Sequence, residues 1–121
     1  MRNLVMVILS SGLLVGCATS VERFPTADLE RSKQVEFMQP YELSRTDVEF
    51  VDLGVVRGES CQRPLLDGQA SQEEAMIAMK LAAADKQANR IVLKRCQQDS
   101  DGGCTARWWC EGTAFQAQPL Q

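Results

Sequence analysis

The chain has five cysteines and no histidine, and these two counts frame the chemistry that is open to it. Without histidine it lacks the commonest general base, and a nucleophilic serine or cysteine would have no imidazole partner. No two cysteines have the Cys-x-x-Cys spacing of a thioredoxin-like redox centre or of a typical zinc site. We therefore expect a protein that is not an enzyme, with no catalytic residue, no metal and no other cofactor. The cysteines instead indicate acylation and disulfide formation.

The first cysteine, Cys17, ends an apolar N-terminal segment that has the form of a lipoprotein export signal. One positive charge at Arg2 precedes about a dozen apolar or small residues, which end in Leu14-Val15-Gly16 directly before Cys17. Such a segment is shorter than the roughly 20 apolar residues that span a bilayer. In signals of this kind the thiol receives a diacylglyceryl group and the chain is cut before it. We predict a signal peptide over 1–16 and a lipid membrane anchor at Cys17; the alternative is an ordinary secretory signal in which this cysteine is incidental.

The four remaining cysteines would reach an oxidising compartment, where disulfides form and persist. An even number in a short exported chain favours two bridges, which allow three connectivities. A zinc site made of four thiolates is the rival interpretation. The four residues are Cys61, Cys96, Cys104 and Cys110.

A hairpin between the last two predicted strands would favour one of these connectivities. If Cys96 lies opposite Cys110, then Cys104 lies near the tip of the connecting loop, from where it can reach Cys61. A local bridge between Cys104 and Cys110 stays open as the alternative. The same register pairs Ile91 with Phe115 and Leu93 with Thr113.

Three predicted strands must hold these cysteines in place. Apolar and charged residues roughly alternate in the first strand, which we expect to contain a bulge or bend at Gly54. The second strand ends at Cys96, and the turn-forming stretch 99–103 separates it from the third. The strands are expected over 48–56, 91–96 and 105–115, with a loop over 59–70.

One main helix is predicted between the first two strands. Ser71 and Glu74 have the spacing of a capping box, strong helix formers follow as far as Ala88, and Asn89 suits a left-handed end. The face that recurs at three- and four-residue spacing should pack into the core. That face consists of Met76, Met79, Ala82 and Ala83.

The chain is long enough for one small domain and a tether. Residues 17–44 mix charged and polar residues without a sustained period, so we expect a lipidated N-terminus and tether there, with room for a short helix around 26–37. A disulfide-bonded domain is expected over 45–116 and a tail over 117–121. The predicted fold is α+β, a small disulfide-stapled sheet of three to four strands with one helix on one face. A formal net charge of −3 without a basic block argues against nucleic acid as a partner.

The block from Val51 to Gln62 (VDLGVVRGESCQ) resembles the start of the signalling domain of the RcsF family. The resemblance continues through the helix end at 86–89, the apolar strand into Cys96, the Gly103-Cys104 pair, and Cys110 before Glu111-Gly112. It implies a small disulfide-bonded α/β domain with interleaved bridges, Cys61–Cys104 and Cys96–Cys110. It also implies a lipid-anchored protein of the outer membrane, and Ala18 after the lipidated cysteine fits that destination.

The resemblance further implies a function that involves no catalysis. Members of the RcsF family sense envelope stress and activate the Rcs phosphorelay through protein–protein contacts. Their implied partners are outer-membrane β-barrel proteins, the barrel-assembly machinery and the inner-membrane regulator IgaA. The alternative for this chain is a structural or assembly lipoprotein with the same fold and no signalling role.

Two adjacent tryptophans are the candidates for a partner contact. Neighbouring residues of a strand point to opposite faces, so we expect one of Trp108 and Trp109 to be exposed. An exposed tryptophan can anchor an interface. Partial burial under the loop that carries Cys104 is the alternative.

Overall fold

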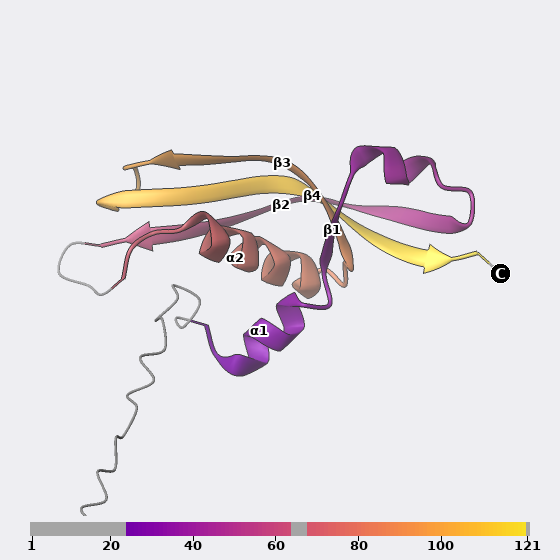
Figure 1. The fold of residues 1–121 in the computed structure, drawn as a ribbon, viewed down its shortest axis with the longest axis horizontal. Helices are drawn as coiled ribbons and strands as arrows, with labels where there is room; N and C mark the ends of the chain where they lie inside the picture. The colour runs from indigo at the N-terminus through magenta and orange to yellow at the C-terminus, as the bar shows by residue number, and fades with distance from the viewer. Residues whose placement is uncertain (1–23, 64–67, 121) are drawn as a thin grey trace, which may run out of the picture.

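Four strands form one mixed sheet, and the main helix lies across it (Figure 1). The computed structural model describes residues 24–63 and 68–120. The strand order is β1-β3-β4-β2, in which β1 runs parallel to β3 and the other two pairs are antiparallel. The predicted α+β class with one main helix is confirmed. In chain order the elements are α1 (Thr26–Ser32), β1 (Glu36–Met38), the 3-10 helix η2 (Pro40–Ser44), β2 (Val48–Gln62), α2 (Gln72–Asp85), β3 (Arg90–Asp99) and β4 (Ala106–Pro119).

Helix α2 approaches β2 so closely that only glycine fits at position 58. A Cβ built on Gly58 would lie 2.2 Å from the Met79 amide nitrogen and 2.3 Å from the Ala75 carbonyl oxygen. The helix therefore packs backbone against backbone, and its predicted apolar face is buried. Met79 and Ala83 are fully buried, and Met76 and Ala82 pack against the same core as partly buried residues.

The start of α2 follows the predicted capping signal. Ser71 is the N-cap residue, and its Oγ accepts a hydrogen bond from the Glu74 amide at 3.1 Å. The Glu74 carboxylate also accepts from the Ser60 hydroxyl at 2.9 Å, which ties the first turn of the helix to β2.

The C-terminal end of α2 differs from the expectation. The helix ends at Asp85, and Gln87, with a φ of 65°, takes the left-handed conformation that we expected of Asn89. Asn89 pairs with β4 instead, because its Oδ1 accepts from the Ala117 amide at 2.7 Å and its Nδ2 donates to the Ala117 carbonyl at 3.0 Å.

The strands extend further than the sequence pattern indicated. Residues 57–62 of β2 pair one for one with residues 106–111 of β4, so the start of the predicted 59–70 loop is strand. The far ends of β3 and β4 also pair, with Gln97 opposite Trp109 and Asp99 opposite Arg107. Charged and polar residues fill these extensions because one face of the sheet is not covered by the helix.

Two irregularities set the strand registers. The predicted bulge near Gly54 is confirmed, since the β2–β4 register shifts between Asp52 and Gly54 and Gly54 has a φ of 95°. Cys96 does lie opposite Cys110. The predicted pairing of residues 91–93 with β4 was wrong by one residue, because a second register shift lies between Leu93 and Arg95. The observed pairs are Ile91 with Ala114 and Leu93 with Gly112.

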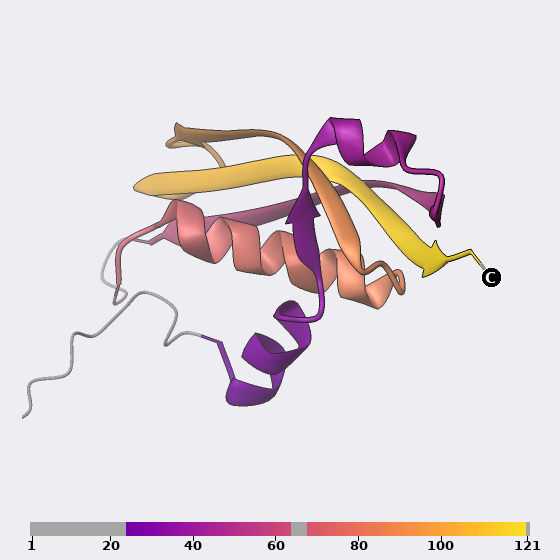
Figure 2. The ribbon, with the colours of Figure 1, turned by 45° about the vertical axis from the view of Figure 1, so that its right-hand side comes forward.

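The folded part of the chain begins before the boundary expected at residue 45. Strand β1 extends the sheet beside β3, with Phe37 opposite Ile91, and Val35 and Met38 are buried. Helix α1 contacts α2. Figure 2 shows α1 and α2 on one side of the sheet and η2 on the other. These residues looked like tether because their apolar side chains are too few to show a period.

The C-terminal end of the folded domain also differs from the predicted residue 116, since β4 reaches Pro119, which pairs with Val48.

The predicted signal peptide over 1–16 and Cys17 lie outside the described residues. Among the residues that are described, no helix is long and apolar enough to cross a membrane.

Candidate interaction surface

The sheet face opposite α2 carries a cluster of charged side chains around one tryptophan. Gly58 and Ser60 of β2 point to the helix, so Arg57 and Glu59 point to the other face. Their neighbours on β4 and β3 follow the same alternation. We call this set the outer-face cluster: Arg57, Glu59, Arg95, Asp99, Arg107, Trp109 and Glu111.

Trp109 lies at the centre of the outer-face cluster and is only 8% exposed. The guanidinium carbon of Arg57 lies 4.5 Å from the indole centroid, and that of Arg95 lies 5.0 Å from it. The indole Nε1 donates to Asp99 Oδ2 at 3.0 Å. Cation–π contacts of this kind stabilise by about 0.5–1 kcal/mol at exposed sites. Trp109 is therefore a rigid aromatic platform with an arginine from each neighbouring strand.

Asp99 is held by two parallel hydrogen bonds from Arg107. Arg107 Nε donates to Asp99 Oδ1 and Nη2 to Oδ2, both at 2.8 Å, while Nη1 lies 3.4 Å from Glu59 Oε2. The Arg107 bonds, with smaller help from the Asp101 amide and Trp109, lower the pKa of Asp99 to about 2. The same pairing raises the pKa of Arg107. This pair is thus a fixed, charge-neutral support beside Trp109.

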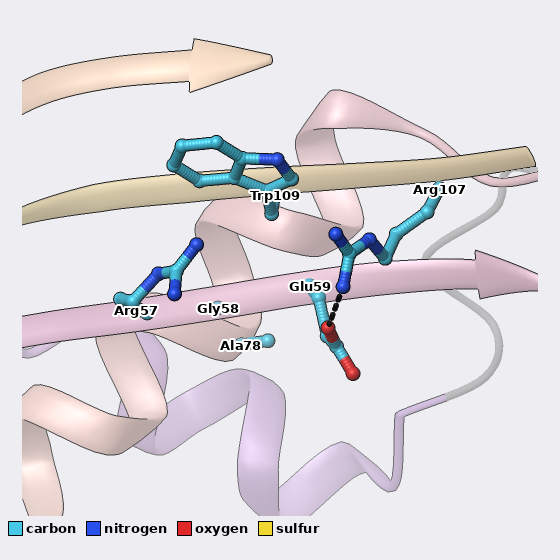
Figure 3. Close-up of a pocket in the computed structure, with 6 residues that line it drawn as sticks. All are labelled: Arg57, Gly58, Glu59, Ala78, Arg107 and Trp109. Carbon is cyan, nitrogen blue, oxygen red and sulfur yellow. Dashed lines mark hydrogen bonds and ion pairs between the residues drawn. The ribbon is translucent and has the colours of Figure 1, made fainter. Parts of the chain in front are cut away.

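A groove of about 330 Å³ opens beside Trp109 along β2 (Figure 3). Arg57 and Glu59 extend from β2 at its rim, and Arg107 reaches toward Glu59 from β4. The groove has small residues where the chain passes beneath it, Gly58 of β2 and Ala78 of α2.

Arg57 has spare hydrogen-bonding capacity toward this groove. Its ion pair runs from Nε to Glu111 Oε2 at 3.6 Å, and Lys94 lies 3.7 Å from the other oxygen of the same carboxylate. Among the described residues, its two Nη groups have no hydrogen-bond acceptor. The same part of the chain offers Arg95 no carboxylate partner. Two arginines beside one indole can therefore bind a carboxylate or another planar anion.

The structure separates the two predicted tryptophans. Trp108 is half-buried on the helix side and packs against the core, so the expectation of one exposed indole was wrong. Trp109 belongs to the surface cluster, but its neighbours cover it. Sequence reasoning missed Arg57, Arg95 and Arg107. The signal was available in the period-two spacing of residues 57 and 59 and of residues 107, 109 and 111.

Two interleaved disulfides hold the strands that carry this surface. Cys61 at the end of β2 is bonded to Cys104 in the β3–β4 loop, 43 positions away, and Cys96 is bonded to Cys110 across β3 and β4. This is the pairing that the hairpin argument and the family resemblance favoured. The local Cys104–Cys110 bridge is not formed. Because all four sulfurs are bonded in pairs, they cannot act as zinc thiolates.

The described residues hold no cluster of three or more His, Cys, Asp or Glu side chains that could bind a metal ion. The outer-face cluster is built from tryptophan and arginine, residues that are enriched among those that dominate interface energies.

Comparison with known proteins agrees with the resemblance. Residues 20–118 match the RcsF lipoprotein family, and the chain therefore belongs to that family. Two relatives are the outer membrane lipoprotein RcsF of Escherichia coli strain K12 and the protein of the same name from Escherichia coli O6:H1 strain CFT073. Each is 36% identical over 67 residues, which cover 54% of this chain and 50% of the relative. The chain thus spans about half the length of the curated relatives that it matches.

Proposed function

We propose that this protein is a lipid-anchored sensor of the outer membrane that detects envelope stress and activates the Rcs phosphorelay through protein–protein contacts, without catalysis. Its family and the outer membrane location in the names of its relatives support this proposal. The anchor would be the acylated Cys17, after removal of residues 1–16. The partners would be outer-membrane β-barrel proteins, the barrel-assembly machinery and an IgaA-like regulator of the inner membrane.

The outer-face cluster is the observation that supports a binding role most directly. Trp109, held by Asp99, positions the guanidinium groups of Arg57 and Arg95 over its ring, so less side-chain entropy would be lost when a partner binds these arginines. Arg57 and Arg95 reach solvent around it with unused donors. Trp108 supports this surface from the core side and is assigned no direct contact.

The test is complementation in cells that lack their own RcsF but keep an intact phosphorelay. The full chain should restore stress-dependent transcription, and crosslinking should capture the IgaA-like regulator. Replacing Arg57 and Arg95 together by Gln should reduce this capture about tenfold, as expected when two contacts near an interface centre are lost.

The matched control replaces Lys33 and Arg45 by Gln, because these exposed cations change the charge equally and lie outside the cluster. Equal signalling by both double variants would contradict the role of the cluster. Unaltered transcription on deletion of the protein, with continued crosslinking to β-barrel proteins, would favour the structural or assembly role.

A further inference from the structure

Strand β2 forms one edge of the sheet and carries the groove. The strand order places β4 on one side of β2, and no strand of the described residues pairs with its other side. The opposite edge is different, since β1 covers part of β3. An unpaired edge presents backbone N–H and C=O groups that can pair with another chain.

The pairing pattern identifies the backbone groups that face outward. The Cα atoms of Cys96 and Cys110 are 4.1 Å apart, which is the spacing of a non-hydrogen-bonded antiparallel pair. Cys110 therefore directs its backbone groups toward β2, where its partner is Gly58. It follows that Gly58 bonds to β4, whereas Arg57 and Glu59 direct their N–H and C=O groups to the free edge. Val55 fits this alternation, since its carbonyl oxygen accepts from Lys86 Nζ at 3.3 Å.

The free length of this edge is short and bounded. Lys86 and the register shift at Asp52 and Gly54 occupy one end, and the Cys61–Cys104 bridge lies at the other. Between them lies the groove of about 330 Å³, which Arg57, Glu59 and Ala78 help to line. A single extended segment fits this space better than a broad surface does.

The charged side chains around the groove indicate which kind of partner segment it can bind. Arg107 contacts both Asp99 and Glu59, so both carboxylates are already engaged, although its single positive charge offsets only one of them. Arg57 directs its two Nη groups toward the groove (Figure 3), and the guanidinium carbon of Arg95 lies 5.0 Å from the Trp109 ring centroid. The charges of the outer-face cluster sum to zero, and within the described residues the cationic donors left without an acceptor at the groove are the two Nη groups of Arg57.

We propose that the outer edge of β2 at Arg57 and Glu59 accepts an extended, acidic strand of a partner protein. The strand pairs with the backbone of these two residues, and one of its carboxylates binds the Arg57 guanidinium beside Trp109. This rests on the proposed function and names the chemistry of the partner. Strand addition supplies affinity through backbone bonds and specificity through alternate side chains.

The experiment uses the full lipidated chain in detergent micelles and three fluorescent peptides. All three have the sequence Thr-Val-Thr-X-Thr-Val-Thr, with X as Glu, Gln or Lys. The Glu peptide should bind about tenfold more tightly than the Gln peptide, as one charge-assisted hydrogen bond provides. In the variant Arg57→Glu the order should reverse in favour of the Lys peptide. Arg45→Glu, which makes the same charge change outside the cluster, should keep the original order.

A fourth probe tests the backbone pairing. The Glu peptide with alternate backbone amides N-methylated keeps its carboxylate but cannot pair as a strand, and it should not bind. Equal binding of the methylated and unmethylated peptides would overturn the proposal, as would no binding of the Glu peptide. A dimer of the chain that dissociates in Arg57→Glu would assign the edge to a second copy and would also overturn it. Peptide binding that persists while signalling fails would instead count against the proposed function.

Discussion

Trp109 shows how a residue that looks exposed in a strand pattern can be covered by its own neighbours. Period-two alternation correctly places it on the face away from α2, yet it is 8% exposed because Arg57 and Arg95 lie over its ring. Cross-strand diagonal contacts of this kind depend on register. The predicted β3–β4 register holds at Trp109, which lies opposite Gln97, but the pairing of β2 with β4 was not predicted, so the sequence placed Trp109 on a face without identifying Arg57 as its neighbour.

Asp99 gives this cluster a pH dependence that can be measured. Its pKa is about 2 in the folded chain and about 3.9 in an unfolded one, so its ionised form stabilises the fold above about pH 4 and this stabilisation is lost as the pH falls toward 2. In Asp99→Asn the contribution should be missing. The difference in urea midpoint between the parent and this variant should be constant above about pH 5 and shrink between about pH 4 and 2.

The control for this prediction is Glu49→Gln, which removes an exposed carboxylate of β2 that has no ion pair within the described residues. Its unfolding midpoint should stay close to that of the parent at neutral pH. A difference for Asp99→Asn that persists unchanged at pH 2 would contradict the role assigned to the carboxylate.

At the scale of elements, local sequence signals predicted which helices and strands form more accurately than where each of them ends. The capping residue Ser71, the apolar face around Met79 and the bulge near Gly54 each follow from a few neighbouring residues. The end of α2 and the extension of β2 depend on long-range partners. Asn89 favours a left-handed turn in isolation, but its side chain makes two hydrogen bonds with the backbone of β4. Tertiary pairing therefore decides where these elements end.

The Asn89 contact predicts a local loss of stability. Asn89→Ala removes both bonds to Ala117 and should lower the free energy of unfolding by about 1–3 kcal/mol, at roughly 0.5–1.5 kcal/mol for each bond. Urea denaturation measures this change. Hydrogen exchange at the Ala117 amide should also accelerate, since that amide loses its acceptor.

Asn89→Asp provides the matched comparison, because it keeps an acceptor for the Ala117 amide but loses the donor to its carbonyl. Its effect on exchange at Ala117 should be smaller than that of Asn89→Ala. Equal exchange rates in the parent and in Asn89→Ala would show that the end of β4 is held by other contacts.

At the scale of the whole molecule, the folded domain includes more residues than the span of the four cysteines indicates. The four cysteines span residues 61–110, and the alternating pattern begins near residue 48, but the core also takes in Val35 and Met38. Strand β1 is three residues long, and a three-residue strand has too few side chains to show a period. Its recruitment to β3 could not be read locally, because it depends on a partner more than fifty positions away.

Val35 tests whether this N-terminal region belongs to the folded unit. It is 1% exposed, so Val35→Ala in the full chain should lower the free energy of unfolding by about 1–3 kcal/mol through lost burial and an unfilled space. The matched control is Val55→Ala, because Val55 is 58% exposed and its replacement should change stability by less than about 0.5 kcal/mol. A Val35 variant as stable as the Val55 variant would return the domain boundary to residue 45.

The position of the Cys61–Cys104 bond decides how the molecule would respond to tension along its backbone. A pull between the two termini can pass from Cys61 directly to Cys104, so everything between these residues, including α2 and β3, lies in a side loop that bears no load. Only the backbone before Cys61 and after Cys104 can therefore extend under such a force. A force applied at the N-terminal end would therefore act first on α1 and β1, while α2 lies outside the covalent path that bears it.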